Sequence, residues 1–136
     1  MPPVRIVVDT NVLVSRALTP AGPPARVVDA VLTGRLVACF DSRILREYEE
    51  VLARPRFGFD PSNAAHLLAY LTAEGLLFEP PAVTLRLPDE SDRPFVEVAA
   101  AADAWLVTGN PGHFPGFARA ISPAAFLTRT LPPPPA

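Results

Sequence analysis

The chain has 136 residues, of which 49% are apolar and 19% charged, and its 14 acidic and 12 basic residues give a net charge of −2. This length suits one domain, and the apolar content excludes a disordered chain. The charge balance argues against a protein that grips nucleic acid through bulk positive charge, but it leaves open a contact with phosphate through a metal ion.

The basic residues are all arginines, and the chain has no lysine. Chemistry that needs an amine, such as P-loop phosphate binding or a Schiff base, is therefore excluded. The single Cys39 lies in an apolar run, and we expect an inert buried thiol in a reducing compartment. The sequence has neither a signal-peptide pattern nor an apolar stretch of ~20 residues, so we expect a soluble, cytoplasmic protein.

Short apolar runs alternate with helical patterns along the whole chain. In the first half we predict, in order, strand 4–8, helix 10–18, helix 25–33, strand 36–40, helix 42–54 and helix 61–74. In the second half we predict a weak strand within 76–87, helix 91–102, strand 104–108, strand 120–122 and a helix from 123. This alternation predicts one α/β domain over residues 1–130, an α/β/α sandwich with a central parallel sheet. Residues 131–136 are predicted to form a disordered, proline-rich tail.

Polar residues follow two of the predicted strands. Asp9 comes directly after the first strand, and Thr108 and Asn110 follow the strand that ends near Val107. Because ligands of such sheets bind beyond the carboxyl ends of the strands, we expect these residues to face one crevice. Asp9 could also simply cap the next helix, but a carboxylate at the end of a buried strand is costly unless something such as a metal ion compensates it.

Further acidic residues are weaker candidates. Glu47 lies at the edge of an apolar helical stripe and could reach a crevice, whereas Glu49 and Glu50 are expected to be solvated. Asp92 lies in a capping position at the start of the helix over 91–102, where acids also suit the helix dipole. Glu97 has three interpretations: a metal ligand, a group that supports one, or a surface charge.

Two histidines complete the set of candidate residues. His113 lies in a tight loop shaped by Gly109, Pro111 and Gly112, and it is either structural or a ligand or acid. His66 lies among leucines in a predicted helix, and no catalytic role is expected for it.

Four stretches in this order resemble the PIN-domain ribonucleases, and within them the VapC-like toxins of bacterial toxin–antitoxin pairs. The stretches are Val-Val-Asp9-Thr-Asn11-Val-Leu, Leu-Arg-Glu47-Tyr-Glu-Glu-Val-Leu-Ala-Arg-Pro-Arg-Phe57, Asp92-Arg-Pro-Phe-Val-Glu97-Val-Ala and Leu-Val-Thr108-Gly-Asn110. The resemblance covers nearly the whole chain apart from the tail. It implies RNA cleavage at a divalent-metal crevice, a partner antitoxin and a homodimer.

Carried over by position, the resemblance implies that Asp9, Glu47 and Asp92 are catalytic and bind Mg²⁺ or Mn²⁺. Asn110 stands where many members have a further aspartate, and we include it as a metal ligand without charge. Asn11, Thr108 and Glu97 are expected to support these groups. Crowded carboxylates repel one another, and a hard divalent cation relieves that repulsion.

Other classes fit less well. A receiver domain or a haloacid-dehalogenase-like phosphatase needs a lysine, and a dinucleotide-binding module needs Gly-x-Gly-x-x-Gly after the first strand. The remaining alternative is a degenerate PIN fold that binds RNA or protein without catalysis.

Overall fold

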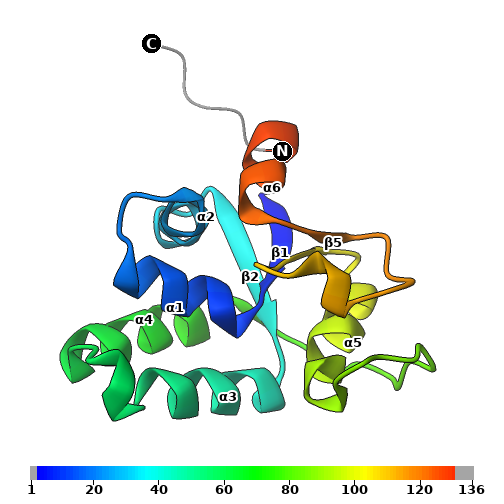
Figure 1. Cartoon of the computed structure of the whole chain (residues 1–136), viewed down its shortest axis with the longest axis horizontal. Coiled ribbons are helices and arrows are strands. Elements are labelled where there is room, and N and C mark those ends of the chain that lie inside the picture. Colours follow the sequence, from blue (N-terminus) through cyan, green and yellow to red (C-terminus); the bar gives the residue numbers. More distant parts are fainter. Residues whose placement is uncertain (1–2, 131–136) are drawn as a thin grey trace.

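The computed structural model describes residues 3–130, and the tail predicted for residues 131–136 lies outside them. A five-stranded parallel sheet in the order β3-β2-β1-β4-β5 forms the centre. The strands are β1 (Val4–Val8), β2 (Leu36–Phe40), β3 (Leu76–Leu77), β4 (Trp105–Val107) and β5 (Ala120–Ile121). Helices cover the sheet, and the predicted α/β fold with a central parallel sheet is confirmed (Figure 1).

The helices follow the predicted order. They are α1 (Thr10–Leu18), α2 (Pro23–Leu32), α3 (Ser42–Leu52), α4 (Pro61–Glu74), α5 (Arg93–Ala102) and α6 (Pro123–Thr130). Short 3₁₀ turns occur at η1 (Pro55–Phe57), η2 (Glu90–Asp92) and η3 (Pro111–His113). The helix expected to begin at Ser91 or Asp92 instead starts at Arg93, because the preceding residues form η2. No helix within residues 3–130 is long and apolar enough to cross a membrane.

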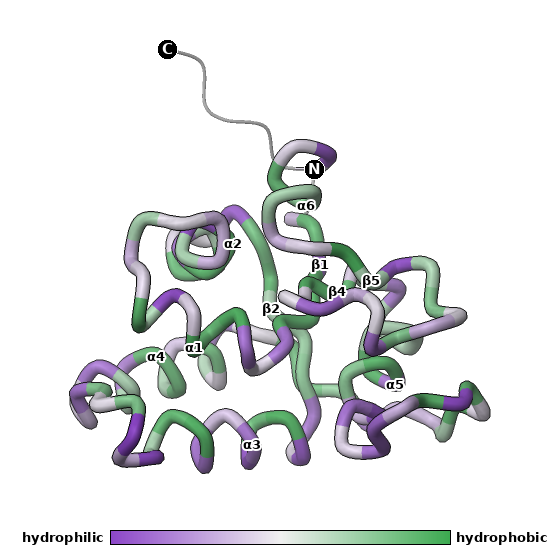
Figure 2. The backbone as a smooth tube through the Cα atoms, viewed as in Figure 1, coloured by the Kyte–Doolittle hydropathy of each residue, from purple (hydrophilic) through white to green (hydrophobic). Residues whose placement is uncertain are grey.

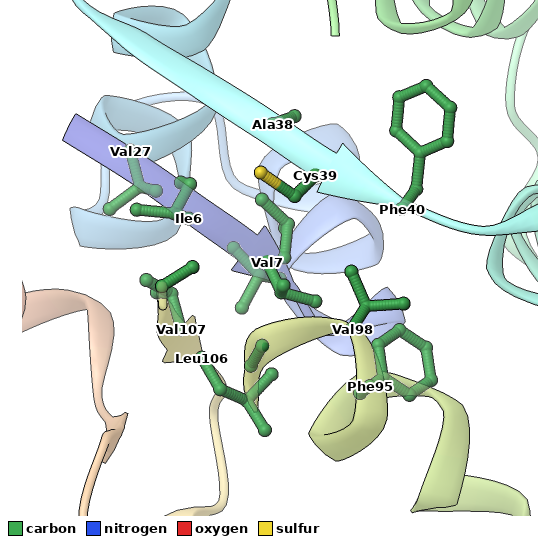
Figure 3. Close-up of a cluster of buried hydrophobic side chains, with 14 of the residues drawn as sticks. Ile6, Val7, Val27, Ala38, Cys39, Phe40, Phe95, Val98, Leu106 and Val107 are labelled. Carbon is green, nitrogen blue, oxygen red and sulfur yellow. The ribbon is translucent and has the colours of Figure 1, made fainter. Parts of the chain in front are cut away.

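The core lies on both faces of β1 and β2. Successive side chains of a strand point to opposite faces, and in Figure 3 Ile6 points toward Val27 of α2 whereas Val7 points toward Phe95 and Val98 of α5. All of these side chains are buried. Figure 2 shows the strands as hydrophobic, with hydrophilic residues at helix ends and loops. The amphipathic α3 buries Ile44, Tyr48 and Leu52, in accord with its sequence pattern.

Strand pairing decides where the functional residues meet. β1 pairs in parallel with β4, and Val8 lies opposite Val107. The chain segments that follow these two strands therefore leave the sheet side by side at its carboxyl edge.

Candidate functional site

A hydrogen-bonded link joins the ends of β1 and β4. The Thr108 hydroxyl donates to Asp9 Oδ2 at 2.7 Å, and the backbone N–H of Asp9 donates to the Val107 carbonyl at 2.9 Å. The Asn11 side-chain oxygen accepts the Gly109 N–H at 3.1 Å. The bond from Thr108 orients the Asp9 carboxylate, and the three contacts together bring the ends of the two strands side by side, as their positions predict.

Glu47 reaches the same region from α3. Its carboxylate accepts a hydrogen bond from the hydroxyl of Thr10, the residue directly after Asp9. The next residue along α3, Tyr48, is buried and donates its hydroxyl proton to the Val8 carbonyl. Two bonds therefore tie α3 to the end of β1 and the start of α1, and the sequence pattern predicts neither.

Asp92 lies at the start of α5 but does not cap it. Its side chain makes no capping hydrogen bond, whereas Asp89 accepts from the Ser91 N–H at 2.9 Å and from the Ser91 hydroxyl at 2.8 Å. Asp92 Oδ2 is buried and has no hydrogen-bond partner. The Nδ1 atom of His113 lies 3.8 Å from this oxygen, too far for a hydrogen bond.

The charge of the Asp9 carboxylate acts on the carboxyl groups of Asp92 and Glu47. Burial raises the pKa of Asp92 to about 6, and the negative charges of Asp9 and Asp89 add to that shift while His113 opposes it. Burial likewise raises the pKa of Glu47, with a further contribution from Asp9 and an opposing one from the Thr10 hydroxyl. Burial also raises the pKa of Asp9 against the hydrogen bond from Thr108. The Asp9 charge thus disfavours ionisation of both Asp92 and Glu47.

This arrangement suits a hard cation in its chemistry. Carboxylate oxygens are the ligands that Mg²⁺ and Mn²⁺ prefer, and a buried Asp92 oxygen without a donor is a position that positive charge would stabilise. Among residues 3–130, no group of three or more His, Cys, Asp or Glu side chains is already arranged to hold a metal ion. The donor set fits such an ion by its chemistry.

The other candidates have different surroundings. The backbone N–H of Asn110 donates to Thr108 Oγ1 at 3.1 Å. Asn110 is therefore bonded to the same hydroxyl that donates to Asp9. The Asn110 side chain is exposed, as are those of Glu49, Glu50 and His66.

Glu97 is engaged outside the crevice. It is only 4% exposed, pairs with Arg43 Nη1 at 2.9 Å and accepts the Val83 N–H at 2.9 Å. Arg43 also pairs with Asp41 at 2.6 Å, and Asp41 caps α3 through the Ile44 N–H. Glu97 therefore holds the irregular segment after β3 against α5 and α3. Its carboxylate is bonded to these partners and to none of Asp9, Glu47 and Asp92.

Comparisons with known proteins agree on one fold. A family model described as PIN domain matches residues 5–111. An uncharacterized protein of Methanocaldococcus jannaschii, MJ1680, is 27% identical over 110 residues, which is 79% of this chain and 71% of that protein.

Two solved structures are similar to the chain. VapBC2 from Rickettsia felis, bound to a DNA fragment from its promoter, aligns with a TM-score of 0.58 and 13% identity over 88% of this chain and 97% of that one. FitAB bound to the IR36 DNA fragment aligns with a TM-score of 0.60 and 15% identity over 87% and 94%. At these identities the structural similarity shows a shared fold.

Proposed function

The chain belongs to the PIN domain family, and from this premise we propose that it is a metal-dependent endoribonuclease whose catalytic, metal-binding residues are Asp9, Glu47 and Asp92. The observation that carries the proposal is the buried, unpartnered oxygen of Asp92 beside two further carboxylates of raised pKa. A protein tolerates such a cluster poorly unless a cation completes it. We propose Mg²⁺ or Mn²⁺ as that cation.

The roles of the side chains follow from their contacts. Asp9 and Asp92 would hold the ion, with Asp9 oriented by the Thr108 hydroxyl. Glu47 would complete the ligand set from α3, held by the Thr10 hydroxyl. When bound, the ion supplies positive charge that polarises the scissile phosphate and stabilises the charge that develops as the bond breaks.

Asp9→Asn tests this function. The substitution keeps the size of the side chain and removes its charge, so cleavage of single-stranded RNA with Mg²⁺ or Mn²⁺ should fall at least ~100-fold while the circular dichroism spectrum stays unchanged. Glu49→Gln is the matched control, because Glu49 is an exposed acid on the same helix as Glu47, and it should cleave like the wild type. If the wild type cleaves no RNA with either metal, or Asp9→Asn cleaves equally well, the proposal is wrong. RNA binding that survives EDTA without any cleavage would instead support the non-catalytic alternative.

Asn110 offers a second test of the metal site. An amide oxygen can bind a hard cation but brings no negative charge, so Asn110→Asp should tighten binding of Mn²⁺ to the RNA-free protein. We expect a gain of about tenfold in a calorimetric titration. Unchanged affinity would mean that Asn110 only shapes the loop between β4 and η3.

We also propose a protein partner and a homodimer. The resemblance to VapC-like toxins supports an antitoxin as that partner, and the shared fold with VapBC2 and FitAB, each solved with DNA, is consistent with this. The antitoxin would keep the nuclease inactive in the cytoplasm. Co-expression with a small reading frame from the neighbouring gene, followed by affinity purification and light scattering, tests both proposals. A strictly monomeric protein that retains no partner would contradict them.

A further inference from the structure

We propose that a groove beside Glu47 binds one nucleotide of single-stranded RNA, adjacent to the bond that is cut, with Phe57 against the base and Arg54 on a phosphate. This inference rests on the proposed ribonuclease function. It places the RNA on one side of the cleavage site in a groove that runs along α3. It adds a binding surface that the acidic residues themselves do not provide.

The groove begins at the candidate site. It has a volume of about 370 Å³ and is lined at one end by Thr10, Asn11 and Glu47 and at the other by Arg54 and Phe57. Thr10 and Glu47 are the hydrogen-bonded pair described above. An RNA strand whose phosphate lies at the carboxylates of the candidate site would therefore enter this groove directly. The volume lies near the lower end of the ~300–1,000 Å³ of small-ligand sites, which suits one nucleotide.

Phe57 is held in place before any ligand arrives. Its ring stacks on Phe59 with 5.5 Å between centroids and 13° between planes. The Arg56 guanidinium lies 4.9 Å from the Phe57 centroid. Aromatic rings interleaved with arginines are the usual platforms for unpaired bases, because every base has a stackable face. Phe59 and Arg56 lie over the ring, so a base would pack against the part of Phe57 that lines the groove. This ordered side chain loses little conformational entropy on binding.

Arg54 supplies the positive charge of the groove. Its Nη2 lies 3.1 Å from Glu50 Oε1, and the side chains are 42% and 69% exposed, so this pair is weak and screened by solvent. A guanidinium has five N–H donors in a planar fork that matches phosphate. Arg54 can thus bind a phosphate, whereas Glu50, which also lines the groove, opposes it. Substitutions at these two positions should act in opposite directions.

The experiment uses a fluorescein-labelled single-stranded RNA of mixed sequence and measures its Kd by anisotropy in EDTA. Phe57→Leu and Arg54→Gln should each raise Kd about tenfold. With Mn²⁺ both should raise KM while kcat changes less than about twofold, since neither residue contacts the reacting atoms. Glu50→Gln should lower Kd, a result that a merely structural role would not produce. Arg35→Gln is the matched control, because Arg35 is exposed and precedes β2 at the opposite edge of the sheet, and it should leave Kd unchanged.

Unchanged Kd for both Phe57→Leu and Arg54→Gln would overturn the proposal and leave the groove to a protein partner. That failure is distinct from failure of the nuclease function. If the wild type cleaves RNA and the Phe57 and Arg54 variants bind RNA as tightly as the wild type does, only the groove proposal is wrong. A wild type that binds RNA through Phe57 and Arg54 but never cleaves it refutes only the catalysis. Circular dichroism of Phe57→Leu confirms folding, and the exposed Arg54 gives an independent result if that variant is unstable.

Discussion

Asp92 does not cap α5 with its side chain, although it stands directly before the helix. A residue directly before a helix often caps it, but here Asp89 forms the hydrogen bonds to Ser91. The Asp92 carboxylate is then left beside Asp9 and Glu47, whose charges raise its pKa further above the value that burial alone produces. At neutral pH the metal-free protein therefore contains a strained cluster of anions.

This strain predicts an unusual pH dependence of stability. Folding raises the pKa of Asp92 from 3.8 to about 6, so the folded state binds its proton more tightly than the unfolded state. The contribution of the protonated Asp92 to folding stability is fully present below pH 3.8, and it is lost as the pH rises through about 6. The metal-free protein should be less stable at pH 7 than at pH 5, by on the order of 1 kcal/mol from Asp92 alone.

Urea unfolding in EDTA at the two pH values measures this difference. Asp92→Asn should reduce the fall in the free energy of unfolding, although Asp9 and Glu47, whose pKa values are also raised, should retain part of it. Equal pH dependence in the variant and the wild type would show that Asp92 is not strained.

At the scale of elements, Gly75 controls the contact between α4 and the sheet. A Cβ at this position would lie 2.5 Å from Phe40 Cε1, 2.6 Å from the Leu71 carbonyl oxygen and 2.7 Å from the Ala38 carbonyl oxygen. Two of these atoms belong to the backbone and cannot rotate away. The chain therefore passes from α4 into β3 through a space that only glycine fits.

Gly75→Ala should accordingly destabilise the protein by about 1–3 kcal/mol, because the added methyl group must displace β3 from β2. A shift of the urea unfolding midpoint measures the effect. Gly22→Ala is the control: its Cβ would meet only Pro24 Cδ at 3.6 Å and Thr19 Cγ2 at 3.9 Å, and its stability should stay within about 0.5 kcal/mol of the wild type. Similar midpoints for Gly75→Ala and Gly22→Ala would contradict this account.

The regular elements could be predicted because each has a local signal. β1 and β2 span the predicted residues, since an apolar run that is unbroken in β2 and interrupted only by Arg5 in β1 suits a sheet buried on both faces. β3 is shorter than its predicted window of 76–87, because it pairs only with Cys39 and Phe40 before Pro80 and Pro81 interrupt the chain.

Side-chain contacts between elements were harder to predict. The positions of Asp9 and Thr108 follow from topology alone, and their hydrogen bond confirms the expected proximity. The bonds from Thr10 to Glu47 and from Tyr48 to Val8 depend on the rotation of α3 about its axis, which periodicity determines only coarsely. Glu97 is buried by an irregular segment with no periodic pattern, so no sequence signal shows which of its three interpretations holds.

For the molecule as a whole, the net charge of −2 limits how RNA can be held. Long-range attraction is absent, so binding depends on a few local contacts. In EDTA the logarithm of the RNA association constant should fall with the logarithm of salt with a slope of only about −0.7 to −1.4, the value for one or two neutralised phosphates. Anisotropy titrations between about 50 and about 500 mM salt measure this slope. A slope of about −3 or steeper would indicate an extended basic surface that the composition does not provide.

The pairing of β1 with β4 also has a consequence for biosynthesis. Asp9 emerges from the ribosome before its partner Thr108, which is 99 residues further along the chain. A parallel pair of this kind cannot form until the later strand has left the exit tunnel. The nascent chain thus carries the Asp9 carboxylate through the synthesis of those 99 residues without the neighbour that orients it. If the proposed function holds, the site that cuts RNA stays incomplete until the later strand has emerged from the RNA-rich machine that makes the chain.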